Sequence, residues 1–270
     1  MSIHPSAVIG KNVVLGERND IGPHVFIEDN VRIGSDNKIY AGAYIAAGTE
    51  IGNKNQIHMH AVIGHAPQDL AYQGAPTKTL IGDNNIIREF TTIHRGTKEG
   101  TATVLGNENF LMAYSHVAHN CQIGNKVIMV NNATLGGYVT VEDSAFISAM
   151  VVVHQFSRIG KLALVSGLSA VNKDLPPFTI CGGRASIVYG LNAVGLRRAG
   201  IAPATRNEIK QAFKLLYRSD LNVQNAIVEI EKIATTSEVK YFLEFIKSSK
   251  RGICRGGSSS EAKEYEEAES

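Results

Sequence analysis

An aliphatic residue recurs at every sixth position along most of this 270-residue chain. The repeat begins at Ile3 and is unbroken to Ile63, returns at Ile81, and after a second gap runs from Leu105 to Val171. A period of six matches neither the α-helical repeat of about 3.6 residues nor the simple alternation of an isolated strand. Because one hexad is too short to bury a core by itself, the units have to stack on one another.

The residues between the aliphatic positions explain the period. Glycine often follows the aliphatic residue directly, as in Gly10 and Gly16, and Asn, Asp or Gly often stands at the third position after it, as in Asn12 and Asp36. These residue types tolerate the left-handed backbone angles of a tight corner. The fourth position favours small or β-branched residues that can point inward, such as Ala43. Each hexad therefore predicts one short strand and one corner, and three hexads predict a triangular coil of about 18 residues in an all-β parallel β-helix.

The hexads also predict the domain organisation. We expect the β-helix over residues 1–185, with inserted loops at 65–80 and 99–104 where the repeat is interrupted. Loops that protrude from a rigid scaffold often carry binding residues, so both are candidate site elements.

A small α-helical domain is expected over residues 186–255. Beyond Val171 the hexads fail and apolar residues take helical spacing. The tail, residues 256–270, combines GGSSS with an acidic run and is expected to be disordered. Four segments are predicted as helices: residues 186–199, 203–218, 221–234 and 237–250.

Composition excludes several functional classes. Lys and Arg number 27 against 25 Asp and Glu, and a formal charge of +2 is too balanced for a protein that wraps nucleic acid. The three cysteines lack CxxC spacing, which argues against a disulfide framework or a zinc ribbon. No apolar run approaches the ~18 residues of a membrane span, and neither a secretory signal nor a GxxxxGK phosphate loop is found. The sequence thus indicates a cytoplasmic protein with reduced cysteines and no stable membrane insertion.

Charge is distributed unevenly along the chain. Residues 1–189 contain 14 basic and 14 acidic side chains, whereas residues 190–255 contain 12 basic and 6 acidic ones. Within the basic part, four cations spaced four residues apart form one ridge on a predicted helix. A solvated face is the simpler interpretation, and contact with an acidic partner is the alternative. The ridge consists of Arg206, Lys210, Lys214 and Arg218.

Histidines mark the candidate chemistry. His116 and His119 flank one corner, and Gln155 follows His119 after two coil lengths, so the two should stack two coils apart, about 9.6 Å. Gly137 falls between them and can bring a bare backbone N–H to a reacting carbonyl. Histidine is a natural general base for a sugar hydroxyl. Two alternatives remain open, surface histidines without a role and a zinc site that also uses His154.

The ordered motifs resemble a known family. The runs QDLAYQGAPTKTLIGDNN, TIHRGT, SHVAHNC, NNATLGGYVTVED, VHQF, DLPPF, LNAVGLRRAG and KLLYRS, over about residues 1–255, look like the UDP-N-acetylglucosamine acyltransferases of lipid A biosynthesis. The resemblance implies a left-handed coil, a homotrimer with sites between neighbouring coils, and transfer of a 3-hydroxyacyl chain from acyl carrier protein to the 3-position of the UDP-sugar. No cofactor is implied beyond the phosphopantetheine that carries the acyl donor, and no metal.

The same resemblance assigns roles to individual residues. His119 would be the general base, and the N–H of Gly137 would stabilise the oxyanion. Gly167 would set acyl-chain length, and the basic ridge would contact the carrier protein. The residues implied to bind the sugar nucleotide or acyl chain are Gln68, Asp69, His116, His154, Gln155, Asn192 and Arg198.

Five positions depart from the family pattern. Asn120 stands where Asp usually follows the base and Tyr138 replaces a His; Ala71, Ala185 and Ala199 replace basic or histidine side chains. The acceptor is therefore left open between a 3-hydroxyl and a 3-amino sugar. Two other functions are also left open: a hexapeptide acetyltransferase that uses acetyl-CoA, and a non-catalytic trimeric scaffold.

Overall fold

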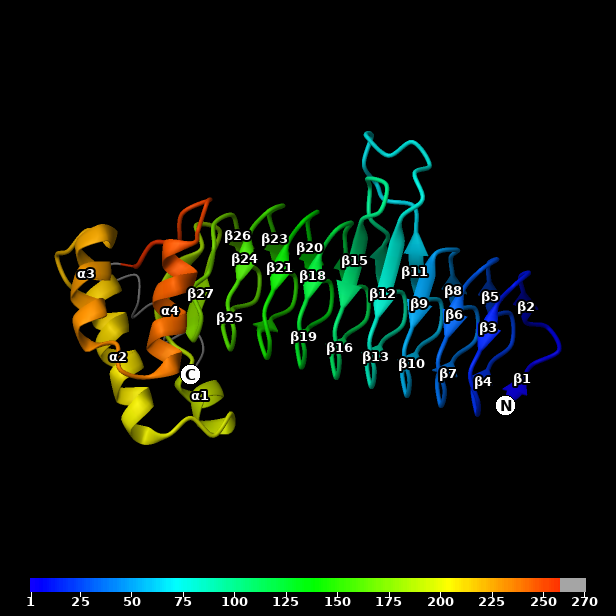
Figure 1. Cartoon of the computed structure of the whole chain (residues 1–270), viewed down its shortest axis with the longest axis horizontal. Coiled ribbons are helices and arrows are strands. Elements are labelled where there is room, and N and C mark those ends of the chain that lie inside the picture. The colour runs from blue at the N-terminus through cyan, green and yellow to red at the C-terminus, as the bar shows by residue number, and fades with distance from the viewer. Residues whose placement is uncertain (258–270) are drawn as a thin grey trace.

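The computed structural model describes residues 1–257 and has the form of a long triangular coil that ends in a helical unit (Figure 1). Ser2 pairs in parallel with Asp20, and Asp20 with Lys38, so each regular coil takes three hexads. The strands of the coil stack in parallel into three sheets, and the coil is left-handed. The parallel β-helix expected from the hexads is confirmed.

Each of the first eight coils contributes one strand to each sheet, in the order first, second, third, and the last coil lacks the third strand. The first sheet contains β1 (Ser2–Ile3), β4 (Asp20–Ile21), β7 (Lys38–Ile39), β10 (Gln56–Ile57), β13 (Ile86–Ile87), β16 (Phe110–Leu111), β19 (Ile128–Met129), β22 (Phe146–Ile147), β25 (Leu164–Val165), β27 (Thr179–Gly182) and β28 (Ile187–Leu191). The second contains β2 (Val8–Ile9), β5 (Phe26–Ile27), β8 (Tyr44–Ile45), β11 (Val62–His65), β14 (Thr92–His94), β17 (His116–Val117), β20 (Thr134–Leu135), β23 (Val152–Val153) and β26 (Ala170–Val171). The third contains β3 (Val14–Leu15), β6 (Arg32–Ile33), β9 (Thr49–Ile51), β12 (Lys78–Ile81), β15 (Ala102–Leu105), β18 (Gln122–Ile123), β21 (Thr140–Val141) and β24 (Arg158–Ile159).

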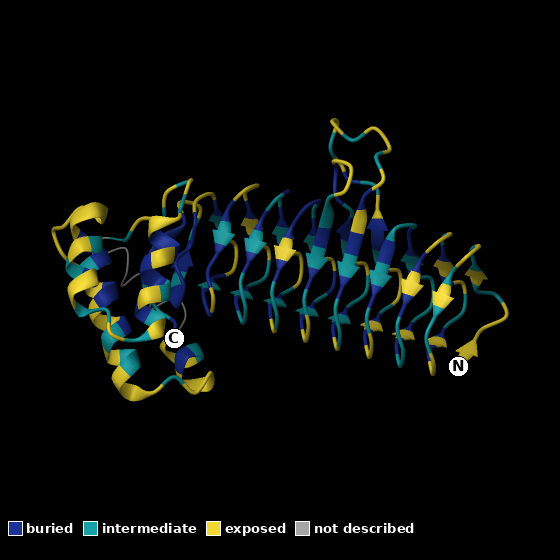
Figure 2. Ribbon diagram, in the orientation of Figure 1, coloured by how far each residue is buried: buried dark blue, intermediate teal, exposed yellow. Residues whose placement is uncertain are grey.

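The aliphatic residue of each hexad points into the coil. Ile27, Ile45 and Ile63 follow one another in the second sheet and are fully buried, while the preceding residue of each strand faces outward. Figure 2 shows this alternation as dark blue strand ends beside exposed corners. Burying a large aliphatic side chain contributes about 1.5–3 kcal/mol, so the stacked rows supply the main stabilisation of the coil.

Corners adopt left-handed backbone angles at the third position after the aliphatic residue. Asn12 and Asn30 do so, as expected, but so do bulky residues such as Phe90 and Tyr114 (φ 59° and 62°). Such angles are strained for residues with a large side chain, so the repeat geometry determines the corner even where the residue type is unfavourable.

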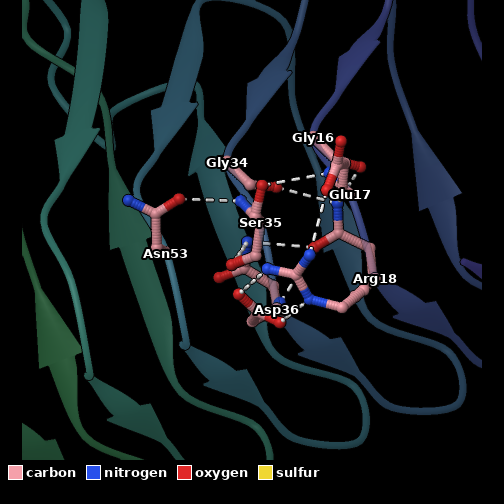
Figure 3. Close-up of polar contacts among 9 residues, drawn as sticks. Gly16, Glu17, Arg18, Gly34, Ser35, Asp36 and Asn53 are labelled. Carbon is pink, nitrogen blue, oxygen red and sulfur yellow. Dashed lines mark hydrogen bonds and ion pairs between the residues drawn. The ribbon is translucent and has the colours of Figure 1, made fainter.

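The corner between the third and first sheets is lined by stacked polar side chains. Figure 3 shows its outer row, in which the N–H of Ser35 donates to Asn53 Oδ1 and Arg18 forms an ion pair with Asp36. Inside, the fourth position is small or β-branched, as the hexads suggested, only at the last three positions along this corner, Val127, Ala145 and Ala163. Asparagines fill the five earlier positions. Each of the last four donates to the Oδ1 of the asparagine one coil earlier, and the first donates to the Gly16 and Gly34 carbonyls, which satisfies these buried amides. This buried row consists of Asn19, Asn37, Asn55, Asn85 and Asn109.

Both insertions leave the coil at one corner, between the second and third sheets (Figure 1). Glu50 pairs with Leu80, and Leu80 pairs with Val104, so the first insertion adds the length of two hexads to its coil and the second adds the length of one. The first loop occupies residues 66–77 and the second residues 95–101. The first is shorter than expected, because β11 and β12 extend into the interrupted segment with four-residue strands. The second begins and ends earlier than expected, because β14 ends at His94 and β15 already begins at Ala102.

The C-terminal unit begins with a strand. Residues 186–199 were expected to be helical, but β28 pairs antiparallel with β27, and the helix starts only at Ala193. The pairing satisfies the backbone groups of β27, which would otherwise form an open edge at the end of the coil. The helices are α1 (Ala193–Arg198), α2 (Pro203–Tyr217), α3 (Val223–Ile233) and α4 (Ser237–Lys247).

The last described residues fasten the helices to the coil. The N–H of Cys254 donates to the Asp174 carbonyl, and the Tyr217 hydroxyl donates to the Cys254 carbonyl. Gly256 forms a β-bridge with Val188, so the expected disordered tail is wrong for residues 256 and 257. The rest of that tail, residues 258–270, lies outside the described residues.

Candidate functional site

One edge of the coil brings together most of the predicted catalytic and substrate-binding residues. We call this the loop edge: the corners that join the second sheet to the third, from which both inserted loops emerge. It includes His119 between β17 and β18, Gly137 between β20 and β21, and Gln155 between β23 and β24. Corners one coil apart stack directly, as the hexad period predicted.

His119 lies at the centre of this edge and is 9% exposed. Its Nε2 is 3.5 Å from Oδ2 of Asp69, in the first inserted loop of the same chain. Its Nδ1 is 3.0 Å from Oδ1 of Asn120. The Tyr138 ring packs edge-on against the imidazole, with centroids 5.3 Å apart. The loop carboxylate and the histidine therefore meet within one chain.

Two further histidines line the second sheet beside His119. His116 Nδ1 lies 2.7 Å from Thr92 Oγ1, and its ring packs edge-on against His94. Burial lowers the pKa of His116, and the nearby His119 lowers it further. Burial, followed by His116, His65 and His119, lowers the pKa of His94 to about 4. Both rings are therefore neutral near pH 7, and the buried Nδ1 of His94 has no hydrogen-bond partner among the described residues.

Gly137 lies directly against the imidazole of His119. A Cβ built on Gly137 would be 2.4 Å from Cε1 and 2.5 Å from Nε2 of His119, closer than real Cβ atoms approach other heavy atoms. Within residues 1–257 the Gly137 N–H has no hydrogen-bond acceptor. A free N–H beside a candidate base is the arrangement that an oxyanion site requires.

Three other predicted residues lie on the loop edge but at its surface. Gln68 is exposed beside Asp69 in the first loop. His154 and Gln155 are exposed two coils beyond His119, and His154 Nδ1 is 3.3 Å from the Arg251 guanidinium. They do not contact His119.

Asn192 and Arg198 lie on a different edge. Asn192 donates to the Leu162 carbonyl, at a corner between the third and first sheets, and its Oδ1 caps α1 by accepting from the Gly195 N–H. Arg198 ends the same helix. We call this corner the helix edge, and it carries a groove of about 620 Å³ between α4 and the coil, lined in part by Lys161 and Tyr241. Within one chain, the structure does not bring Asn192 or Arg198 to His119.

Gly167 occupies the third edge, between the first and second sheets. It lies nearly three coils beyond His119 along the chain, or about 13 Å by strand spacing. A Cβ on Gly167 would meet only the Ala149 carbonyl, at an ordinary contact of 3.5 Å. The coil therefore has room for a larger side chain at this position.

The basic ridge lies on α2, and its members differ in their surroundings. Arg218 donates to the Tyr189 and Gly257 carbonyls, so its charge is used inside the C-terminal unit. Arg206 and Lys210 line a groove of about 250 Å³ between α1 and α2, together with Arg197. Among the residues that the structure describes, these three cations have no acidic partner.

The sequence did not single out His94, Thr97 or Thr103 as site residues. Thr97 donates to Asn120 through its N–H and its hydroxyl, and Thr103 Oγ1 accepts the N–H of Asn120. The second insertion lengthens this coil beyond three hexads, so these residues do not stand at the regular spacing from the predicted site residues. In the described part of the chain, no group of three or more His, Cys, Asp and Glu side chains has the arrangement of a metal site.

Comparisons with known proteins agree with this architecture. Residues 174–254 match a family model described as "Udp N-acetylglucosamine O-acyltransferase; Domain 2", and residues 30–65 and 102–137 match "Bacterial transferase hexapeptide (six repeats)". The acyl-[acyl-carrier-protein]–UDP-N-acetylglucosamine O-acyltransferase of Gloeothece citriformis is 45% identical over 189 residues, 70% of this chain and 68% of that protein. Its counterpart in Anaeromyxobacter is 46% identical over 199 residues, 73% and 77% of the two chains.

Solved structures give the same result over more of the chain. The UDP-N-acetylglucosamine acyltransferase of Bacteroides fragilis superimposes with a TM-score of 0.92 and 42% identity, covering 94% of this chain and all of that one. The Campylobacter jejuni enzyme gives 0.90 and 34%, covering 95% and 100%. The chain therefore belongs to the UDP-N-acetylglucosamine O-acyltransferase family.

Proposed function

We propose that this protein transfers a 3-hydroxyacyl chain from acyl carrier protein to the 3-hydroxyl of UDP-N-acetylglucosamine, the first step of lipid A biosynthesis. Membership of the family supports the activity. The observation that carries it is the conjunction on the loop edge of His119, the Asp69 carboxylate 3.5 Å from its Nε2, and the free N–H of Gly137. These are a base, a sugar-binding carboxylate and an oxyanion donor within one small volume.

The proposed step needs no redox change. The sugar 3-oxygen attacks the thioester carbonyl carbon while its proton passes to His119 Nε2, and the Gly137 N–H stabilises the resulting oxyanion. The C–S bond then breaks, and His119 returns the proton to the phosphopantetheine sulfur. Atoms and charges balance with no metal or further cofactor. His116, and Gln68 beside Asp69, would bind the sugar, with His154 and Gln155 placed for the nucleotide or acyl chain.

The direct test is identification of the product by mass. The purified protein is supplied with 3-hydroxyacyl chains of different length on acyl carrier protein, together with UDP-N-acetylglucosamine or its 3-amino analogue. We expect an ester on the 3-oxygen of the first acceptor. Product from acetyl-CoA in preference to acyl carrier protein would indicate the acetyltransferase alternative, product only with the amino analogue would change the acceptor, and no product with any donor would reject the enzyme.

Gly167 is proposed to set acyl length, because it leaves open space at the third edge. We expect Gly167→Met to fold normally and to shift the preferred donor toward shorter chains, with at least a tenfold change in the ratio of kcat/KM between the longest and shortest acyl carrier protein substrates. Competition assays with mixed donors measure the ratio. An unchanged ratio in the variant would place the end of the acyl chain elsewhere.

The groove between α1 and α2 is proposed to contact the acidic carrier protein. Arg206 and Lys210 lack acidic partners in the described structure, whereas Arg218 is held by carbonyls, so we assign the contact to Arg206, Lys210 and the exposed Lys214. We expect Arg206→Glu/Lys210→Glu to raise KM for acyl carrier protein about tenfold or more and to leave KM for the UDP-sugar unchanged. Lys240→Glu, an exposed cation on α4, is the control. Equal effects on both KM values would reject a carrier contact.

We further propose that sites form between copies in a homotrimer. Asn192 and Arg198 lie on the helix edge and His119 on the loop edge, so a ring in which one chain's helix edge faces the next chain's loop edge would unite them. We expect His119→Ala and Arg198→Ala, each with little activity alone, to recover about one quarter of wild-type activity when refolded together as mixed trimers. No recovery in confirmed mixed trimers would place Arg198 outside the shared site.

The cytoplasm is the proposed compartment. The three cysteines are buried free thiols, as expected in a reducing environment. Within residues 1–257, no helix combines the length and apolar character needed to cross a membrane.

A further inference from the structure

We propose that Tyr138, Thr97 and Asn120 form an uncharged hydrogen-bonded chain that positions His119 with its proton on Nδ1 and its Nε2 lone pair toward the substrate. The expected kinetic effects rest on the proposed function, whereas the hydrogen bonds that position His119 do not. The hydrogen-bonded chain includes two of the positions, 120 and 138, at which this protein departs from the family pattern. Tyr138, Thr97 and Asn120 are positioning residues, because of these four side chains only that of His119 would touch the reacting group.

The orientation of the Asn120 amide follows from its neighbours. The backbone N–H of Thr97 lies 3.1 Å from one amide atom of Asn120, and a backbone N–H can only donate. That atom is therefore the oxygen. The Thr97 hydroxyl is 2.9 Å from the same oxygen, and as donor it holds the amide from a second direction.

The tautomer of His119 follows from the orientation of Asn120. Its Nδ1 lies 3.0 Å from the same Asn120 oxygen, which can only accept, so Nδ1 carries the hydrogen. In the neutral ring Nε2 is then unprotonated, and it faces Asp69 in the first loop. A base needs a free lone pair on the side of the substrate, and this tautomer supplies it.

Tyr138 extends the chain by one link. Its hydroxyl is 3.1 Å from Thr97 Oγ1; because the Thr97 hydrogen is directed to Asn120, Tyr138 is the donor. Thr97 and Asn120 are 6% and 7% exposed, so water competes little for these bonds. The N–H of Asn120 donates to Thr103 Oγ1 at 2.7 Å, which fixes the backbone at this left-handed corner (φ 60°).

Because a carboxylate already contacts the His119 ring, it matters that the hydrogen-bonded chain at Nδ1 carries no charge. Asp69 from the first loop is the carboxylate that contacts the ring, and His94, His116 and Tyr138 approach it from β14, β17 and the next corner. An Asp in place of Asn120 would add a second negative charge at Nδ1 and favour the protonated imidazole, which cannot act as a base. The neutral chain gives the same tautomer without that penalty.

Steady-state kinetics over a range of pH tests the chain. We expect Asn120→Leu to lower kcat about 10²-fold, and Thr97→Val about tenfold, with KM for both substrates nearly unchanged. Thr97→Ser keeps the hydroxyl and should retain wild-type kcat. Asn120→Asp should move the acidic limb of the kcat/KM profile upward by about one pH unit, because protonated His119 then persists to higher pH. Tyr138→Phe should have the smallest effect, about two- to fivefold.

The tautomer can also be observed without turnover. Nitrogen NMR of protein labelled with ¹⁵N-histidine distinguishes a protonated ring nitrogen from an unprotonated one, and His119→Gln assigns the signals. We expect the wild type to show hydrogen on Nδ1 of His119 and Asn120→Leu to show a mixture of tautomers. Circular dichroism and thermal unfolding confirm that each variant is folded.

The outcomes distinguish the positioning chain from the proposed function. Hydrogen on Nε2 in the wild type, or wild-type kcat and an unshifted acidic limb in both Asn120 variants, would overturn the positioning chain while leaving the transferase intact. If the wild type transfers no acyl group to any acceptor, the proposed function fails; the NMR comparison still decides whether Asn120 sets the tautomer.

Discussion

Replacing His119 with Ala is expected to lower kcat by about 10²–10⁴-fold with little change in KM for UDP-N-acetylglucosamine. The reason is that the variant removes the group that takes the proton from the sugar 3-hydroxyl, while Asp69 and the other polar groups around the sugar remain. The measurement is the rate of transfer from 3-hydroxyacyl carrier protein at saturating sugar nucleotide. External imidazole should restore part of the rate, because the variant leaves a space where the ring was.

A matched control is His24→Ala. His24 stands at a left-handed corner like the residue beside His119, but on the edge between the first and second sheets, far from the inserted loops. Its removal tests whether loss of any corner histidine weakens the coil enough to affect turnover. Unaltered transfer by folded His119→Ala protein would show that a different group removes the proton.

The second large effect is expected for Gly137→Ala, which should lower kcat at least about 10²-fold. The added Cβ would lie 2.4 Å from Cε1 of His119, so the imidazole has to move away from its position beside the free N–H. The base and the oxyanion donor stabilise the same transition state, so a change in their relative position raises its free energy. The close contacts are with side-chain atoms, and so we expect the coil itself to fold.

Gly190→Ala provides the comparison for this substitution. Gly190 lies in β28, and a Cβ there would meet no heavy atom within 4 Å. This variant adds the same methyl group without touching His119, and it should keep the wild-type rate. If Gly137→Ala is folded and equally active, the close approach of Gly137 to His119 has no catalytic role.

Much of the architecture could be predicted because the hexad repeat is a local pattern with a global consequence. A coil of three hexads predicts that His119, Gly137 and Gln155 share one edge, and β17, β20 and β23 do stack in that order. The loops could be located because an interruption of a strict period is visible in the sequence. Their exact bounds could not, because strands β11, β12 and β15 lengthen beside them to make additional backbone hydrogen bonds.

The sequence was less informative where contacts cross the repeat. Residues 187–191 were expected to be helical, and only their pairing with β27 makes them a strand. The sequence pattern did not predict asparagine in the interior of the coil, although each buried asparagine occupies the inward position of its hexad. Their burial becomes favourable only when the preceding coil supplies another asparagine oxygen and the next coil supplies a glycine carbonyl.

The site residues also divide into those that the sequence predicts correctly and those whose role depends on tertiary contacts. By sequence, Asn120 indicates a loss of carboxylate support for the base, yet its oxygen accepts from His119 Nδ1 and is oriented by Thr97. Thr97 lies 23 residues from Asn120 in a loop, and no regular spacing relates the two. Similarly, Arg218 fits the charge ridge by sequence, but its guanidinium is bound to main-chain carbonyls.

The sequence by itself determined the parallel coil, its period and the edge on which the histidines gather, because a six-residue repeat admits few ways to bury one aliphatic residue per unit. Only the tertiary structure decided that Asp69 reaches His119 within one chain, that Asn192 lies on another edge, and that a neutral chain from Tyr138 orients the base. Those facts depend on the positions of an inserted loop and a C-terminal helix, and non-local packing determines both positions.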